Sequence, residues 1–113
     1  MTLLTTFSSD ENWSAFWSSL SAVPIALVYK HSTRCPVSTS ARSRMEELAS
    51  LRPDLRILQV DVIAERPLSQ EISRRFGVVH ESPQAILVRD GQAVWHASHS
   101  RVTVEAVTSQ LQV

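Results

Sequence analysis

Apolar residues first recur at helical spacing near the start of the chain. Four of them fall at positions i, i+3, i+4 and i+7 and predict the face of a helix that packs against a sheet: Trp13, Phe16, Trp17 and Leu20. The polar run before them, Ser8-Ser9-Asp10-Glu11, has the pattern of a capping box, with serine at the N-cap and glutamate three residues later. Pro24 ends the segment, because proline does not continue a helix. We therefore expect an N-terminal helix.

Further helices and strands follow from the same kind of pattern. Apolar runs bounded by turn residues predict strands over residues 25–30, 55–62, 84–89 and 93–97. Apolar stripes at helical spacing predict helices over residues 38–50, 67–76 and 103–111. Gly77 is a natural C-terminal stop for the helix before it, and Asp90-Gly91 is a hairpin signal between the last two strands.

The order of these elements predicts the fold class. An initial strand–helix–strand unit, followed by a helix and a hairpin, gives a mixed four-stranded sheet with helices on both faces. The N-terminal helix is an extra element of this α/β, thioredoxin-like arrangement. The chain has 113 residues and no linker, repeat or low-complexity segment, so we expect a single domain over residues 1–113.

Charge and composition exclude several classes of protein. Lys+Arg and Asp+Glu are equal at 11 each, so no basic surplus favours nucleic acid or an anionic membrane as a partner. No apolar run approaches the ~18 residues of a membrane span, and we find no signal-peptide pattern. The one cysteine excludes a disulfide framework and fits a reducing compartment, so we expect a cytoplasmic protein.

The single cysteine lies between the first predicted strand and the helix that follows it. Proline favours the first helical position, so Pro36 makes Cys35 the candidate N-cap. The free N–H groups of Val37 and Ser38, together with the helix dipole, then favour the nucleophilic thiolate. Arg34 is a candidate for an adjacent cation. We therefore expect a reactive Cys35 whose pKa lies below the unperturbed ~8.5, in preference to an inert, buried cysteine.

The motif around the cysteine has the length of the Cys-x-x-Cys redox motif but ends in serine: Cys35-Pro36-Val37-Ser38. Since the chain has no other thiol, a mixed disulfide on Cys35 must be resolved by an external thiol. Ser38 lies one helical turn from the sulfur. Its hydroxyl either hydrogen-bonds the thiolate or is satisfied by the backbone.

Three segments together resemble the monothiol bacilliredoxins of the YtxJ type, which are cytosolic, thioredoxin-fold proteins of bacteria that use bacillithiol as their small thiol. These segments cover residues 30–38 (KHSTRCPVS), 80–84 (HESPQ) and 95–99 (WHASH). The active-site pattern of that family is Thr-Cys-Pro-Ile-Ser. Arg34 and Val37 depart from it, the first by adding a charge beside the nucleophile and the second conservatively.

The resemblance implies an activity. Cys35 attacks the mixed disulfide of an S-bacillithiolated protein, takes over the bacillithiol, and is freed by bacillithiol or another external reducing thiol. Bacillithiol is then a co-substrate, and neither a metal nor a nucleotide cofactor is expected. In thioredoxin-like folds the Ser82-Pro83 peptide is cis, Pro83 faces the cysteine, and the backbone of Ser82 pairs with the substrate chain. His31 and His80 are possible accessory groups, because a histidine near the site can protonate the leaving thiol.

Other classes of protein fit the residues less well. Four histidines and one cysteine invite a zinc interpretation, but no paired ligand spacing surrounds Cys35. An iron–sulfur glutaredoxin is expected to have Cys-Gly-Phe-Ser, which Pro36-Val37 contradicts, and a peroxiredoxin is expected to have proline where Val28 stands. The alternative that stays open is a non-catalytic thioredoxin-like module for redox sensing or binding.

Overall fold

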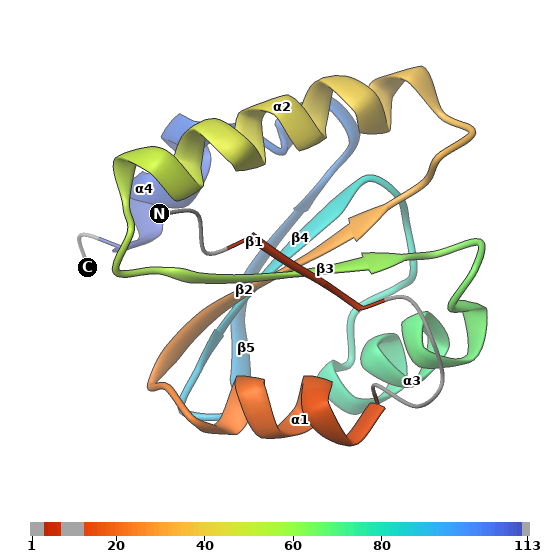
Figure 1. The fold of residues 1–113 in the computed structure, drawn as a ribbon, viewed down its shortest axis with the longest axis vertical. Coiled ribbons are helices and arrows are strands. Elements are labelled where there is room, and N and C mark those ends of the chain that lie inside the picture. The colour runs from red at the N-terminus through yellow and green to blue at the C-terminus, as the bar shows by residue number, and fades with distance from the viewer. Residues whose placement is uncertain (1–3, 8–12, 112–113) are drawn as a thin grey trace.

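A five-stranded mixed sheet runs through the middle of the molecule in the order β1-β3-β2-β4-β5 (Figure 1). The computed structural model describes residues 4–7 and 13–111. The strands are β1 Leu4–Phe7, β2 Ile25–His31, β3 Arg56–Asp61, β4 Gln84–Arg89 and β5 Gln92–Ser98. β3 is parallel to β1 and β2, whereas β4 is antiparallel to both β2 and β5. The thioredoxin-like arrangement expected from the sequence is confirmed.

Helices cover both faces of this sheet. Figure 1 shows α2 (Pro36–Leu51) and α4 (Val104–Leu111) above the sheet, and α1 (Trp13–Ser21) and α3 (Arg66–Phe76) below it. Each face has its own hydrophobic core, because alternate strand residues point to opposite sides. Val28 and Ile86 belong to the core under α1 and α3, and Leu27 and Leu87 to the core under α2 and α4. A short 3-10 helix, η2 (His99–Arg101), joins β5 to α4.

The prediction of four strands was incomplete, because β1 adds a fifth strand at the edge of the sheet. It pairs in parallel with β3, from Leu4 opposite Ile57 to Phe7 opposite Val60. A run of only four residues, Leu-Thr-Thr-Phe, carries no resolvable alternation of apolar and polar positions. The pairing that makes it a strand lies some fifty residues away in the chain, where sequence spacing does not reveal it.

The aromatic stripe of α1 packs against the sheet, as predicted, for the side chains that the structure describes. Phe16 is completely buried and Leu20 nearly so. Trp17 lies between the rings of Phe16 and Phe76, with Arg75 over its face at 4.2 Å. The side chain of Trp13 and the capping box of residues 8–11 lie outside the described residues.

The predicted turns are present, and they orient the elements around one edge of the sheet. Gly77 ends α3 with a left-handed φ of 67°, and Asp90 and Gly91 turn the β4–β5 hairpin with φ of 53° and 82°. α3 begins at Arg66, one residue before Pro67. Because β2, β3 and β5 run in one direction and β4 in the other, the carboxyl ends of β2, β3 and β5 lie at the same edge of the sheet as the start of β4. α2 begins at this edge.

Candidate active site

Cys35 caps the N-terminus of α2 in the loop that follows β2. Its backbone is extended (φ −114°, ψ 119°), and Pro36 is the first helical residue, as predicted. The carbonyl of Cys35 accepts the first backbone bonds of the helix, from the N–H groups of Ser38 at 3.0 Å and Thr39 at 3.3 Å. The cysteine is a free thiol and is partly exposed to solvent. A partner in solution can therefore reach the sulfur.

The first turn of α2 lowers the pKa of the Cys35 thiol. The largest contribution comes from the backbone N–H of Ser38, and the N–H of Val37 and the Ser38 hydroxyl add to it, while partial burial acts in the opposite direction. This direction agrees with the one expected from the sequence. Arg34 is exposed, and it is not among the described groups that lower this pKa. The helix terminus, rather than the arginine, is what favours the thiolate.

Ser38 is held in place by the loop that carries the cysteine. It is completely buried, and the backbone N–H of Ser32 donates to its Oγ at 3.2 Å. Because a hydroxyl can accept one bond and still donate its own proton, this backbone contact leaves the Ser38 proton available to the sulfur. The two roles considered for Ser38 are therefore compatible, since the backbone positions a hydroxyl that also lowers the pKa of Cys35.

Tyr29 and His31 support this turn from the sheet below. The hydroxyl of Tyr29 donates to the carbonyl of Ser38 at 2.9 Å and lies 3.0 Å from Nδ1 of His31. A tyrosine has one proton to donate, so Nδ1 of His31 is the donor in their contact. Burial, followed by the nearby Arg42 guanidinium, lowers the pKa of His31. His31 is thus a buried neighbour of the Ser38 turn and favours the neutral form.

The Ser82-Pro83 peptide is cis, as the resemblance implied. Pro83 is buried and directly precedes β4. Lys30 pairs with Gln84 at the end of the β2–β4 ladder, so Pro83, which precedes Gln84, and His31, which follows Lys30, lie at the same edge of the sheet. The proline is therefore at the edge of the sheet where α2 begins. Its proximity to the sulfur stays a prediction.

His80 lies in a different set of contacts, on the side of the sheet that α3 covers. Its Nδ1 is 3.1 Å from the Nζ of Lys30 and 3.2 Å from the hydroxyl of Ser69. Lys30 also donates to the hydroxyl of Ser73 at 2.6 Å. A part for His80 in proton transfer stays a prediction.

Two residues that matter at this edge were missed from the sequence, namely Tyr29 and Lys30. Both lie in an apolar strand and are completely buried. The sequence did contain a hint, because a tyrosine hydroxyl or a lysine ammonium in a buried strand needs a hydrogen-bond partner. Burial lowers the pKa of Lys30 to about 8 and raises that of Tyr29 above its usual range.

Other expectations concern metals and membranes. In residues 4–7 and 13–111 no group of three or more His, Cys, Asp and Glu side chains is placed to hold a metal ion. Likewise, no helix in this part of the chain is long and apolar enough to cross a membrane. One of the histidines, His99, contacts a carboxylate rather than a metal site: its Nε2 lies 3.7 Å from an oxygen of Glu81.

Comparison with known families decides the identity of this site. A family model described as monothiol bacilliredoxin BrxC matches residues 5–107. The chain belongs to the monothiol bacilliredoxin family. A solved structure described as a putative oxidoreductase with a thioredoxin fold is similar over 95% of this chain and 92% of its own, with 29% identity and a TM-score of 0.85. The resemblance found in the sequence is thus confirmed, and it supports a thiol redox role for this bacilliredoxin.

More distant structures show the same fold. Thioredoxin NaTrxh from Nicotiana alata is 15% identical, with 98% of this chain and 91% of that chain covered and a TM-score of 0.81. Mitochondrial thioredoxin 3 from Saccharomyces cerevisiae is 16% identical, with 96% and 93% covered and a TM-score of 0.76.

The first prediction concerns the thiol. The rate of Cys35 alkylation by iodoacetamide should follow a titration with a midpoint below ~8.5, the value of a free thiol. Ser38→Ala should raise that midpoint because it removes the hydroxyl contribution, but the midpoint should stay below the free value because the backbone N–H groups remain. Ser43→Ala, an exposed serine later in α2, is the matched control. A midpoint at or above ~8.5 in the wild type contradicts this assignment.

The second prediction concerns Lys30. Its pKa is about 8 in the folded chain against an ordinary 10.5, so between these values the unfolded chain binds more protons. The charged amine therefore disfavours folding at and below pH 8, and this cost falls as the pH rises. Relative to Lys30→Met, the wild type should gain stability from pH 8 to pH 10, at no more than ~1.4 kcal/mol per pH unit. Urea unfolding at each pH measures this, and a constant difference between the two proteins contradicts it.

Proposed function

We propose that this bacilliredoxin removes bacillithiol from S-bacillithiolated proteins. The observation that carries the proposal is a single, partly exposed cysteine at the N-terminus of α2, with a lowered pKa and with serine where a resolving cysteine would stand. Membership of the monothiol bacilliredoxin family supports the choice of bacillithiol as the small thiol.

The chemistry is a pair of thiol–disulfide exchanges. The Cys35 thiolate attacks the bacillithiol sulfur of the mixed disulfide, a new S–S bond forms to Cys35, and the old one breaks. The target protein leaves as a thiolate and takes a proton from solvent. A second, external thiol then attacks the adduct, takes over the bacillithiol, and restores the Cys35 thiolate. Electrons come from that external thiol, so no metal or nucleotide takes part in the proposal.

Three groups have distinct roles in this scheme. The N–H groups of Val37 and Ser38 stabilise the thiolate before attack and after release. The Ser38 hydroxyl adds a bond to the sulfur and cannot resolve the adduct, because it is no thiol. Arg34 is exposed and directly precedes Cys35 in the chain, and we assign it to contact with the substrate rather than to the pKa of the cysteine.

The partners and the compartment follow from the same chemistry. The partners are S-bacillithiolated proteins, together with bacillithiol or another reducing thiol. A free thiol that must be regenerated by small thiols suits the reducing cytoplasm, which we propose as the location.

The third prediction tests the transfer. The wild type, mixed with an S-bacillithiolated model protein, should release the protein thiol and accumulate one bacillithiol on Cys35, as mass spectrometry shows directly. Cys35→Ser should abolish the release, because a neutral hydroxyl without an adjacent base is a poor nucleophile. Ser38→Ala should slow it several-fold, whereas Ser43→Ala, the exposed control, should leave it unchanged. Added small thiol should clear the adduct and restore the free enzyme.

Three outcomes count against the proposal in different ways. Release by Cys35→Ser excludes the cysteine as the nucleophile. Equal rates on glutathione-linked and bacillithiol-linked proteins leave a generic monothiol oxidoreductase. A stable adduct that no small thiol clears points to the redox-sensing alternative.

A further inference from the structure

An open groove of about 850 Å³ runs along the outer edge of β5, between that strand, η2 and the start of α4. Its volume is within the range of ordinary small-molecule sites. Trp95 forms an apolar wall, Arg101 and Thr103 lie at the η2–α4 end, and Glu81 lies at the end near the cis proline. None of the residues considered for the thiol chemistry lines this groove, so the groove is distinct from the first turn of α2 that carries Cys35.

Backbone contacts connect the groove to the active-site edge of the sheet. The N–H of His99, which lines the groove, donates to the carbonyl of Pro83 at 2.8 Å. Ser98 pairs with Gln84, the first residue of β4. The order β2-β4-β5 then puts the end of β5 two strand spacings, about 10 Å, from the end of β2 that leads to Cys35. The groove therefore opens at the edge of the sheet from which the chain leads to Cys35.

One side chain that lines the groove, Arg101, can bind an anion. Its one acidic side chain, Glu81, has a carboxylate oxygen 3.7 Å from Nε2 of His99. Arg101 is exposed, and within the described ranges it has no hydrogen-bond or ion-pair partner. An arginine guanidinium binds a carboxylate in two parallel bonds, which adds geometric selectivity to attraction. The guanidinium of Arg101 is thus available to bind a carboxylate in the groove.

The backbone at the groove is held in an uncommon conformation. His99 has a φ of 59°, a left-handed value that few residues other than glycine adopt. Its N–H bond to Pro83 and its contact with Glu81 hold this turn between β5 and η2. Such local strain is a frequent feature of binding surfaces.

We propose that this groove binds the carboxylate-bearing end of the small thiol in the mixed disulfide, with Arg101 as the specificity-determining residue. The inference rests on the proposed function for the identity of that thiol. It assigns recognition of the small thiol to the β5–η2 edge, and leaves the first turn of α2 to activate the sulfur.

A binding measurement that needs no reaction tests this directly. S-Methylbacillithiol, which cannot exchange, is titrated into the wild type while the indole N–H signals of the three tryptophans are followed by NMR. The signal of Trp95 should shift, and that of Trp17, under the opposite face of the sheet, should not. S-Methylcysteamine, which has no carboxylate, should leave Trp95 unshifted at the same concentration and ionic strength.

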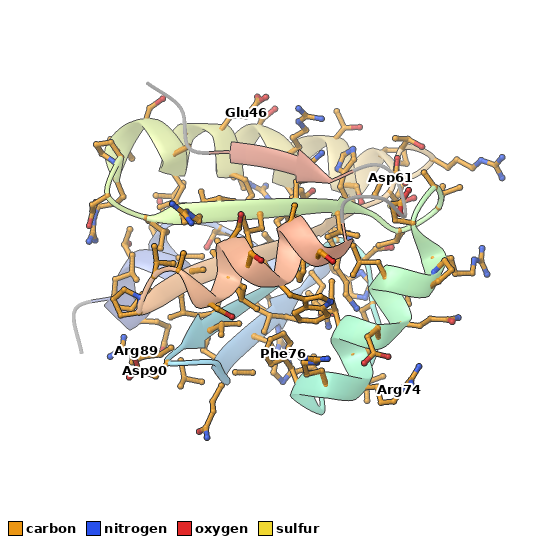
Figure 2. All side chains as sticks on the ribbon, turned by 60° about the horizontal axis from the view of Figure 1, so that its bottom comes forward. Glu46, Asp61, Arg74, Phe76, Arg89 and Asp90 are labelled. Atoms are coloured by element: carbon orange, nitrogen blue, oxygen red, sulfur yellow. The ribbon has the colours of Figure 1, made fainter. Side chains whose placement is uncertain are left out.

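Two arginine variants make the test specific. Arg101→Gln should weaken binding of S-methylbacillithiol about tenfold, in keeping with loss of a charge-assisted pair. Arg74→Gln is the matched control, because Figure 2 shows Arg74 on the outer side of α3 and Arg74 does not line the groove. Its side chain is 74% exposed, so it should bind like the wild type. An unshifted Trp95 in the wild type, or equal affinity of Arg101→Gln and wild type, overturns the inference.

The groove and the proposed function fail separately. If the wild type removes bacillithiol from a model protein but Trp95 does not shift, the groove assignment is wrong and the function stands. If Trp95 shifts and Arg101→Gln weakens binding but no transfer occurs, the groove is a binding site of a protein whose function lies elsewhere.

Discussion

The backbone N–H groups of Val37 and Ser38, at the start of α2, are the constraint on which the rest of this site depends. A thiol is a nucleophile only as its anion, and those N–H groups are what favour the anion at Cys35. Pro36 favours the start of a helix directly after Cys35, and this start places the first N–H groups of α2 beside the cysteine. The groups that lower the pKa of Cys35 are the backbone N–H groups of Ser38 and Val37 and the Ser38 hydroxyl, so the neighbouring Arg34 is not needed for this effect.

The sheet fixes where that helix begins. Tyr29, in the completely buried part of β2, holds the carbonyl of Ser38, and the loop N–H of Ser32 holds its hydroxyl. The first turn of α2 is therefore anchored from below and from the side. Further along α2 the outer face is left to solvent, where Figure 2 shows Glu46 and where Arg42 pairs with Glu46 at 3.5 Å. Packing thus positions the nucleophile, and the exposed charges of α2 contribute little to that.

Local chemistry in the sequence was enough to predict the N-cap, the hairpin and the C-terminal stop of α3, because each depends on a few adjacent residues. The cis proline required the resemblance to a family, since the residues around Pro83 do not themselves determine the isomer. The contacts of Tyr29 with Ser38 and of Lys30 with Ser73 and His80 join distant parts of the chain. Spacing along a sequence does not show such pairs, nor a groove whose walls come from several segments, nor a four-residue edge strand such as β1.

The central claim is that the fold, and not the cysteine alone, makes the nucleophile. Its most direct test compares this protein with a synthetic peptide of residues 28–40, each reacted with bacillithiol disulfide at neutral pH and followed by mass spectrometry. A peptide of this length does not hold the helix by itself, so its thiol has the reactivity of a free cysteine. The protein should form the one-to-one Cys35 adduct faster than the peptide, because only the protein holds the thiol at the start of a helix. An equal or slower rate for the protein contradicts it.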